Sequence, residues 1–141
     1  MEIRFSKRPR PKITDPESVY NLLLDALRFE SEIDQDKEHF WVIGLNTKNQ
    51  VVFLDLVTLG ILNASIYHPR EVFRLAVMKG VFSIIIAHNH PSGDPTPSEE
   101  DKRSQSQLKE AGHILGIEIL DDVIITNGQG FYSFAQNRTE I

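Results

Sequence analysis

Two histidines and one aspartate near the middle of the chain have the residue types and spacing of a catalytic metal site. His88 and His90 end a short apolar run, residues 81–87, that is typical of a strand buried on both faces. Side chains at i and i+2 of a strand point to one face, so the two imidazoles are expected side by side. After a proline-rich loop, Ser98 can cap a helix whose first turn contains Asp101. Two imidazoles and one carboxylate leave a fourth position open, as in catalytic zinc sites.

The same residues also have an ordinary structural interpretation. Ser98 and Asp101 fit the capping-box pattern, and the helix dipole alone favours an acidic residue in the first turn of a helix. A lone histidine at a strand end is usually a hydrogen-bonded polar residue, but a pair at i and i+2 before a proline and glycine loop is seldom accidental. We therefore favour metal binding for His88 and His90 and keep both interpretations of Asp101.

The spacing of these residues resembles the motif of a known family. His88-x-His90, seven residues, Ser98, two residues and Asp101 match the JAMM (MPN+) metalloprotease motif. The string His-Asn-His-Pro-Ser-Gly is similar to the bacterial RadC-like branch of JAB-domain proteins, and the resemblance extends over roughly residues 14–135. One departure is Asp122, because RadC-like proteins generally carry a histidine there. The resemblance implies a JAB/MPN, cytidine-deaminase-like domain over residues 14–141.

This resemblance also implies a function. It predicts a zinc-dependent hydrolase of the metallopeptidase or isopeptidase type, which binds Zn²⁺ and attacks a peptide or protein substrate with metal-activated water. Glu38 matches the family's general base, and Ser98 matches a serine that helps to stabilise the developing oxyanion. From the residues alone the base stays open, since the chain offers other carboxylates, among them Asp55, Glu71, Asp121 and Asp122.

A second hypothesis is a nucleic-acid-binding accessory domain without peptidase activity, in keeping with the DNA-repair label of the RadC group. Its support in the sequence is a basic N-terminal arm, residues 1–13, which contains five lysines and arginines. The whole chain carries a net charge of −5, which gives it no general attraction to nucleic acid. We therefore rank the hydrolase first.

The length and composition of the chain limit the number of domains and exclude several classes of site. A length of 141 residues fits one domain, and the absence of cysteine excludes disulfides, thiol nucleophiles and cysteine-ligated zinc. No apolar run approaches the ~18 residues of a membrane-spanning helix, and the N-terminus has no hydrophobic signal core. We expect a cytoplasmic protein without membrane contact.

The remaining patterns alternate between strands and helices, which predicts an α/β fold: a single-domain mixed β-sheet flanked by helices. The acidic residues 30–38 are expected to form a link. We expect Val77 and Leu115 on the buried faces of their helices. The expected helices cover residues 16–27, 69–79 and 98–115, and the expected strands cover residues 40–45, 51–57, 61–66, 81–87, 117–120, 122–126 and 131–134.

Overall fold

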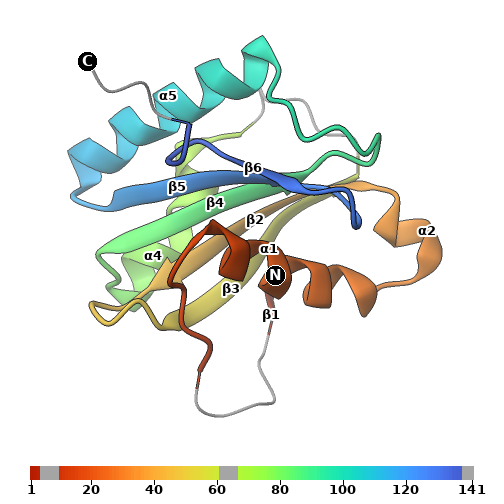
Figure 1. The fold of residues 1–141 in the computed structure, drawn as a ribbon. Helices are drawn as coiled ribbons and strands as arrows, with labels where there is room; N and C mark the ends of the chain where they lie inside the picture. Colours follow the sequence, from red (N-terminus) through yellow and green to blue (C-terminus); the bar gives the residue numbers. More distant parts are fainter. Residues whose placement is uncertain (4–9, 61–66, 138–141) are drawn as a thin grey trace.

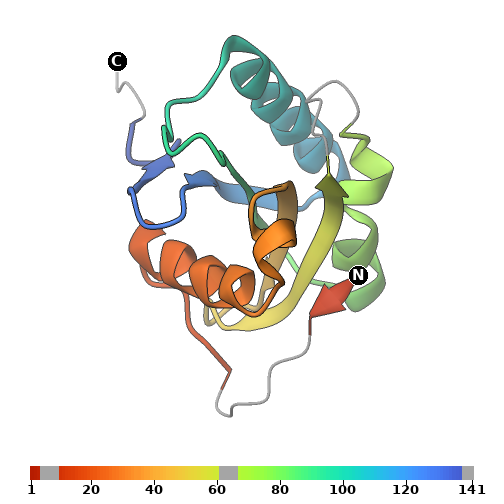
Figure 2. The same ribbon diagram turned by 90° about the vertical axis from the view of Figure 1, so that its right-hand side faces the viewer.

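The computed structural model describes residues 1–3, 10–60 and 67–137, and they form a six-stranded sheet with helices on both faces (Figures 1 and 2). The strand order is β1-β3-β2-β4-β5-β6. β4 and β5 run parallel and are connected through α5, whereas the other neighbouring strands pair antiparallel. The strands are β1 (Glu2–Ile3), β2 (Glu38–Leu45), β3 (Val51–Gly60), β4 (Ser83–Asn89), β5 (Glu118–Ile125) and β6 (Phe131–Ser133). The helices are α1 (Pro16–Arg28), α2 (Glu32–Gln35), α3 (Pro69–Val72), α4 (Arg74–Lys79) and α5 (Glu99–Leu115).

Strand alternation divides the interior into two cores, one on each face of the sheet. On one face, odd-numbered β2 residues such as Trp41 and Ile43 pack with apolar residues of α1. On the opposite face, Phe40 and Val42 pack with Leu108 of α5 and with residues of α3 and α4. Both faces are covered, so seven of the eight β2 residues are buried. The mixed sheet flanked by helices is confirmed.

The cap of α5 fixes the point at which the helix begins. The Ser98 side chain accepts a hydrogen bond from the Asp101 backbone N–H, and the Asp101 side chain accepts one from the Ser98 backbone N–H. At the other end Gly116 has a φ of 74°, in the left-handed region that favours glycine and ends a helix. This capping box determines where Asp101 lies relative to the sheet.

The expectations for three stretches of the chain differ from the observed elements. The helix expected over 69–79 is broken at Phe73 into α3 and α4, and the two strands expected over 117–126 are one continuous strand, β5. The acidic link over 30–38 contains α2 and the first residue of β2. The short strand expected over 61–66 lies outside the described residues.

The burial expected for Val77 and Leu115 is wrong, because these side chains are 59% and 49% exposed. The buried residues of α5 are instead Ser104, Leu108 and Gly112. A Cβ on Gly112 would lie 2.5 Å from the Ile117 carbonyl oxygen, so glycine permits a close approach that turns this side of α5 inward.

The described parts of the N-terminal segment contact the sheet. Glu2 and Ile3 pair with Asp55 and Leu54 of β3, and Lys12 forms a bridge with Gln50. Within the described ranges, no helix combines the length and the apolar character needed to cross a membrane.

Candidate metal centre

The two histidines lie at the carboxyl end of β4, a central strand of the sheet. His88 is the last residue but one of β4, and His90 follows the strand directly. The His90 N–H donates to the Ile125 carbonyl oxygen at 2.9 Å, which continues the hydrogen bonding to β5 beyond the end of β4. His90 is therefore held by backbone contacts, and its side chain points to the same face as His88.

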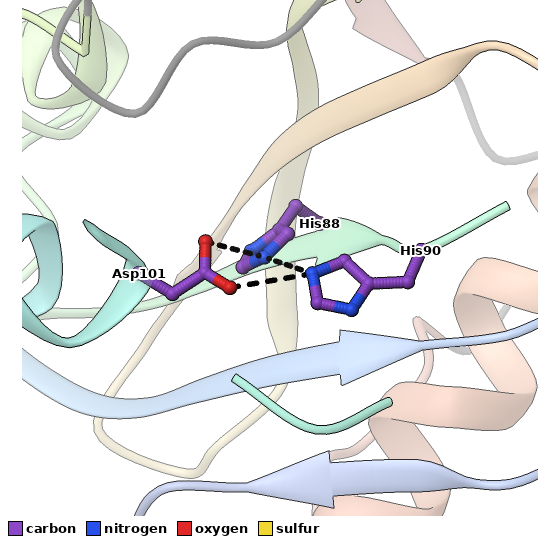
Figure 3. Close-up of side chains that lie close together, drawn as sticks. All are labelled: His88, His90 and Asp101. Carbon is purple, nitrogen blue, oxygen red and sulfur yellow. Dashed lines mark hydrogen bonds and ion pairs between the residues drawn. The ribbon is translucent and has the colours of Figure 1, made fainter. Parts of the chain in front are cut away.

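The imidazoles meet the Asp101 carboxylate in front of this strand end (Figure 3). His88 Nε2 lies 3.3 Å from Asp101 Oδ1, His90 Nε2 lies 3.3 Å from Oδ2, and the two Nε2 atoms are 3.2 Å apart. Ligands held about 2.0–2.1 Å from a tetrahedral zinc ion are separated by about 3.3 Å. One ligand atom from each residue lies within 4.8 Å of the others, so the three residues could hold a metal ion.

The hydrogen bonds around the site orient these donors. Nδ1 of His90 faces the Asp94 carbonyl oxygen at 2.9 Å, and in a neutral ring this contact places the proton on Nδ1 and leaves the Nε2 lone pair free. Asp101 Oδ2 also accepts the Ser98 backbone N–H at 2.9 Å, which fixes the direction of the carboxylate. The capping and metal-binding interpretations of Asp101 are therefore compatible. The chemistry and spacing of the donors fit a zinc ion.

Charge in the site favours a cation. Burial raises the pKa of Asp101, but hydrogen bonds from His88 and His90 outweigh it and hold that pKa well below its usual range. The hydrogen bond to Asp101 raises the pKa of His90, against the effect of burial and with help from the Asp94 carbonyl. Without a metal, Asp101 stays ionised and His90 binds a proton more readily, so protons and metal ions compete for the same ligands.

Glu38 reaches this site because of the strand register. Phe40 of β2 pairs with His88 of β4, and continuing this antiparallel register places Glu38 opposite His90 on the same face. A surface cleft of about 520 Å³ is lined by both Glu38 and His90, together with Pro91 and Ser92. Ser98 is exposed at the start of α5.

The other candidate bases lie elsewhere. Asp55 pairs with the N-terminal ammonium group at 2.8 Å on the β1 side of the sheet, and Asp121 accepts a hydrogen bond from Ser133 at 2.6 Å. Glu71 is an exposed residue of α3. Among the carboxylates considered, Glu38 shares the cleft with His90, whereas Asp122 lines a small cavity behind His88.

Comparison with known proteins identifies the family of this chain. A family model described as the RadC-like JAB domain matches residues 13–139. The chain belongs to the RadC-like JAB domain family. Similar curated proteins include a UPF0758 protein of Caldanaerobacter subterraneus subsp. tengcongensis, which is 52% identical over 118 residues, or 84% of this chain and 48% of the relative. A UPF0758 protein of Moorella thermoacetica is 52% identical over 120 residues, or 85% of this chain and 50% of the relative. A UPF0758 protein of Methanosarcina mazei is 47% identical over 125 residues, or 89% of this chain and 52% of the relative. The chain spans about half the length of these relatives.

Asp122, which departs from the RadC-like pattern, is fully enclosed. Its carboxyl lines the same small cavity as His88, and within the described part of the chain neither Asp122 Oδ1 nor His88 Nδ1, both buried, has a hydrogen-bond partner. Burial raises the pKa of Asp122 well above its usual range, with further contributions from Asp121 and Asp101. This RadC-like domain therefore has a buried carboxyl directly behind one histidine of the site.

Sequence reasoning missed two polar residues beside the centre. Asn89, between the two histidines, is 2% exposed and contacts β2 through its side chain. The ring of His39 is fully buried and has a packing role, since it stacks on Trp41 with centroids 4.9 Å apart. An asparagine alternating with two candidate ligands was the signal that could have drawn attention to the opposite face of β4.

Proposed function

We propose that this domain is a zinc-dependent hydrolase that cleaves amide bonds of peptide or isopeptide type in a peptide or protein substrate. The observation that carries the proposal is the convergence of two imidazole nitrogens and one carboxylate, with one of the imidazoles, that of His90, lining a cleft that Glu38 also lines. A cleft of about 520 Å³ falls within the range of about 300–1,000 Å³ that is usual for ligand sites.

In this proposal His88, His90 and Asp101 hold the ion. A bound Zn²⁺ ion would supply Lewis-acid chemistry, lowering the pKa of a water molecule and polarising the scissile carbonyl. Zinc is favoured by the mixture of imidazole and carboxylate ligands and by the open position, which other first-row metals can also use.

Glu38 is the proposed general base. Its carboxylate accepts a proton from the attacking water and then delivers that proton to the nitrogen of the leaving amine, so the proton is conserved through the step. Its position at the cleft, opposite His90, supports this role. Ser98 is the proposed oxyanion donor: its Oγ accepts the Asp101 N–H in the cap, which leaves the hydroxyl hydrogen able to donate.

The first test separates metal binding from hydrolysis. Metal content is measured by mass spectrometry on wild type, His88→Ala and Asp101→Ala, with His113→Ala as control because His113 is exposed in the last turn of α5. We expect about one zinc per chain in wild type and the control, and loss of zinc in both site variants. Wild-type protein that stays empty after zinc is offered would refute the metal site.

The second test concerns the base. Zinc-loaded wild type is screened against fluorogenic peptide and isopeptide substrates and compared with Glu38→Gln and with Glu32→Gln, a control on exposed α2. Loss of general-base catalysis predicts a decrease in kcat of about 10²–10⁴-fold for Glu38→Gln with zinc retained, and no change in the control. Equal activity of Glu38→Gln and wild type would remove Glu38 from the mechanism.

A further inference from the structure

Asn89 connects the metal-ligand strand to the backbone on both sides of Glu38. It is the last residue of β4 and alternates with His88 and His90, so its side chain points to the opposite face of the sheet. There its Oδ1 accepts the His39 N–H at 2.5 Å, and its Nδ2 donates to the Lys37 carbonyl oxygen at 3.0 Å. These two bonds hold the peptide groups before and after Glu38.

A second group of contacts fixes the same backbone. The buried ring of His39 places Nδ1 2.7 Å from the Lys37 carbonyl oxygen and Nε2 2.5 Å from Glu30 Oε2. The Lys37 carbonyl therefore has two side-chain partners, Asn89 and His39. A peptide group held by two side-chain partners has little freedom to rotate.

We propose that Asn89 is a positioning residue that sets the distance between the Glu38 carboxylate and the metal ligands. This rests on the proposed function, in which Glu38 is the base. His88 and His90 are the covalent neighbours of Asn89, and Lys37 and His39 are the neighbours of Glu38, so the two bonds join ligands and base across the sheet. A shift of about 1 Å between such groups can cost about 100-fold in rate.

The chemistry of the contact requires an amide. One partner on β2 is a donor, the His39 N–H, and the other is an acceptor, the Lys37 carbonyl, and the asparagine side chain offers one of each. Aspartate would keep the acceptor but lose the donor, and its charge would face the Lys37 carbonyl oxygen. Alanine would leave the buried His39 N–H without this acceptor and would remove one of the two partners of the Lys37 carbonyl.

The test uses Asn89→Ala and Asn89→Asp in the full chain, with Asn46→Ala as a matched control. Asn46 lies just after the other end of β2 and also bonds backbone through its side chain, accepting from the Lys48 and Gln50 N–H groups at 2.9 and 3.0 Å. In metal-free protein, we expect faster amide exchange at His39 in Asn89→Ala, which lacks the acceptor oxygen, and unchanged exchange there in the control. Unchanged exchange at His39 in Asn89→Ala would overturn the proposed contact.

A double-mutant cycle with Glu38→Gln separates positioning from general stability. For zinc-loaded protein we expect Asn89→Ala to lower kcat about 10–100-fold with KM and zinc content nearly unchanged, and to have less than about a twofold effect in the Glu38→Gln background. Equal loss in both backgrounds would overturn the positioning role. If Asn89→Ala does not fold, the same cycle is run with the isosteric Asn89→Asp.

Different results would overturn the hydrolase function and the positioning role of Asn89. A zinc-loaded wild type that hydrolyses no substrate overturns the proposed function and, with it, the positioning role. An active wild type that loses activity in Glu38→Gln but not in the two Asn89 variants overturns the positioning role alone.

Discussion

Acid should release metal from this site by protonating its histidines. Metal binding requires neutral imidazoles and an ionised carboxylate, so each histidine that holds a proton must lose it when the ion enters. The pKa of Asp101 is held well below its usual range, so this carboxylate remains ionised and adds no pH dependence near neutrality. The hydrogen bond to Asp101 raises the pKa of His90, so competition from protons begins at a higher pH than for an ordinary histidine.

The size of the effect follows from proton linkage. Well below its pKa, each histidine that must lose a proton lowers the apparent affinity about tenfold per pH unit, or about 1.4 kcal/mol. A single histidine with the ordinary pKa of about 6.5 would lose about tenfold between pH 7.5 and 5.5. Because the pKa of His90 is raised, His90 alone should cause a loss greater than about tenfold. Because only two of the ligands are histidines, the apparent zinc affinity can fall at most about a hundredfold per pH unit.

The assay is zinc competition with a chelator whose own pH dependence is known, at intervals from pH 8 to pH 5. We expect wild type and His113→Ala to show the same steep loss, because His113 is exposed and outside the site. Far-ultraviolet circular dichroism at each pH confirms that the fold is intact. Affinity that stays constant from pH 7.5 to 5.5 would refute imidazole ligation.

Variants at three further positions test neighbouring features. Because the pKa of buried Asp122 is raised, the contribution of Asp122 to the stability of metal-free wild type is fully present below pH ~4 and falls by up to about 1.4 kcal/mol per unit as pH rises towards that pKa. Asp122→Asn should lack this fall in urea unfolding. Ser98→Ala should lower the free energy of unfolding by about 1 kcal/mol, because it removes the cap of α5. Ser98→Asn keeps a capping side chain but lacks the hydroxyl, so it should lower kcat if that hydroxyl stabilises the oxyanion. Gly112→Ala should lower stability by about 1–3 kcal/mol in thermal denaturation, since a Cβ would meet the Ile117 carbonyl.

The local part of the site could be predicted from the sequence. Strand alternation places His88 and His90 on one face, and the helix cap places Asp101 in a first turn; both rules act within about four residues. The ion-pair distances of 3.3 Å show that these local predictions meet in space. The crossover from β4 to β5 through α5 brings the start of the helix back over the end of the strand.

The role of Glu38 depends on information that local patterns do not contain. Its separation from His90 is set by the pairing of Phe40 with His88, and from the sequence its position rested on the family resemblance. The burial of His39 and the contacts of Asn89 depend on the same pairing. Leu115 shows a related limit: helical periodicity favoured burial, but the close approach at Gly112 turned a different side of α5 inward.

The pairing of β2 with β4 is therefore the step that determines where Glu38 lies relative to the metal ligands. Side chains alternate along a strand, so a slip of one residue in β2 would turn Glu38 to the α1 face and bring His39 to the face of the metal ligands. The fully buried ring of His39 and its stacking on Trp41 oppose that slip. The alternative register would move Trp41 out of the core on the α1 face and into the core on the opposite face of the sheet. Asn89 opposes it too, since its amide matches the His39 N–H and the Lys37 carbonyl in one register only. The contacts on the face away from the cleft thus specify which carboxylate faces the metal ligands.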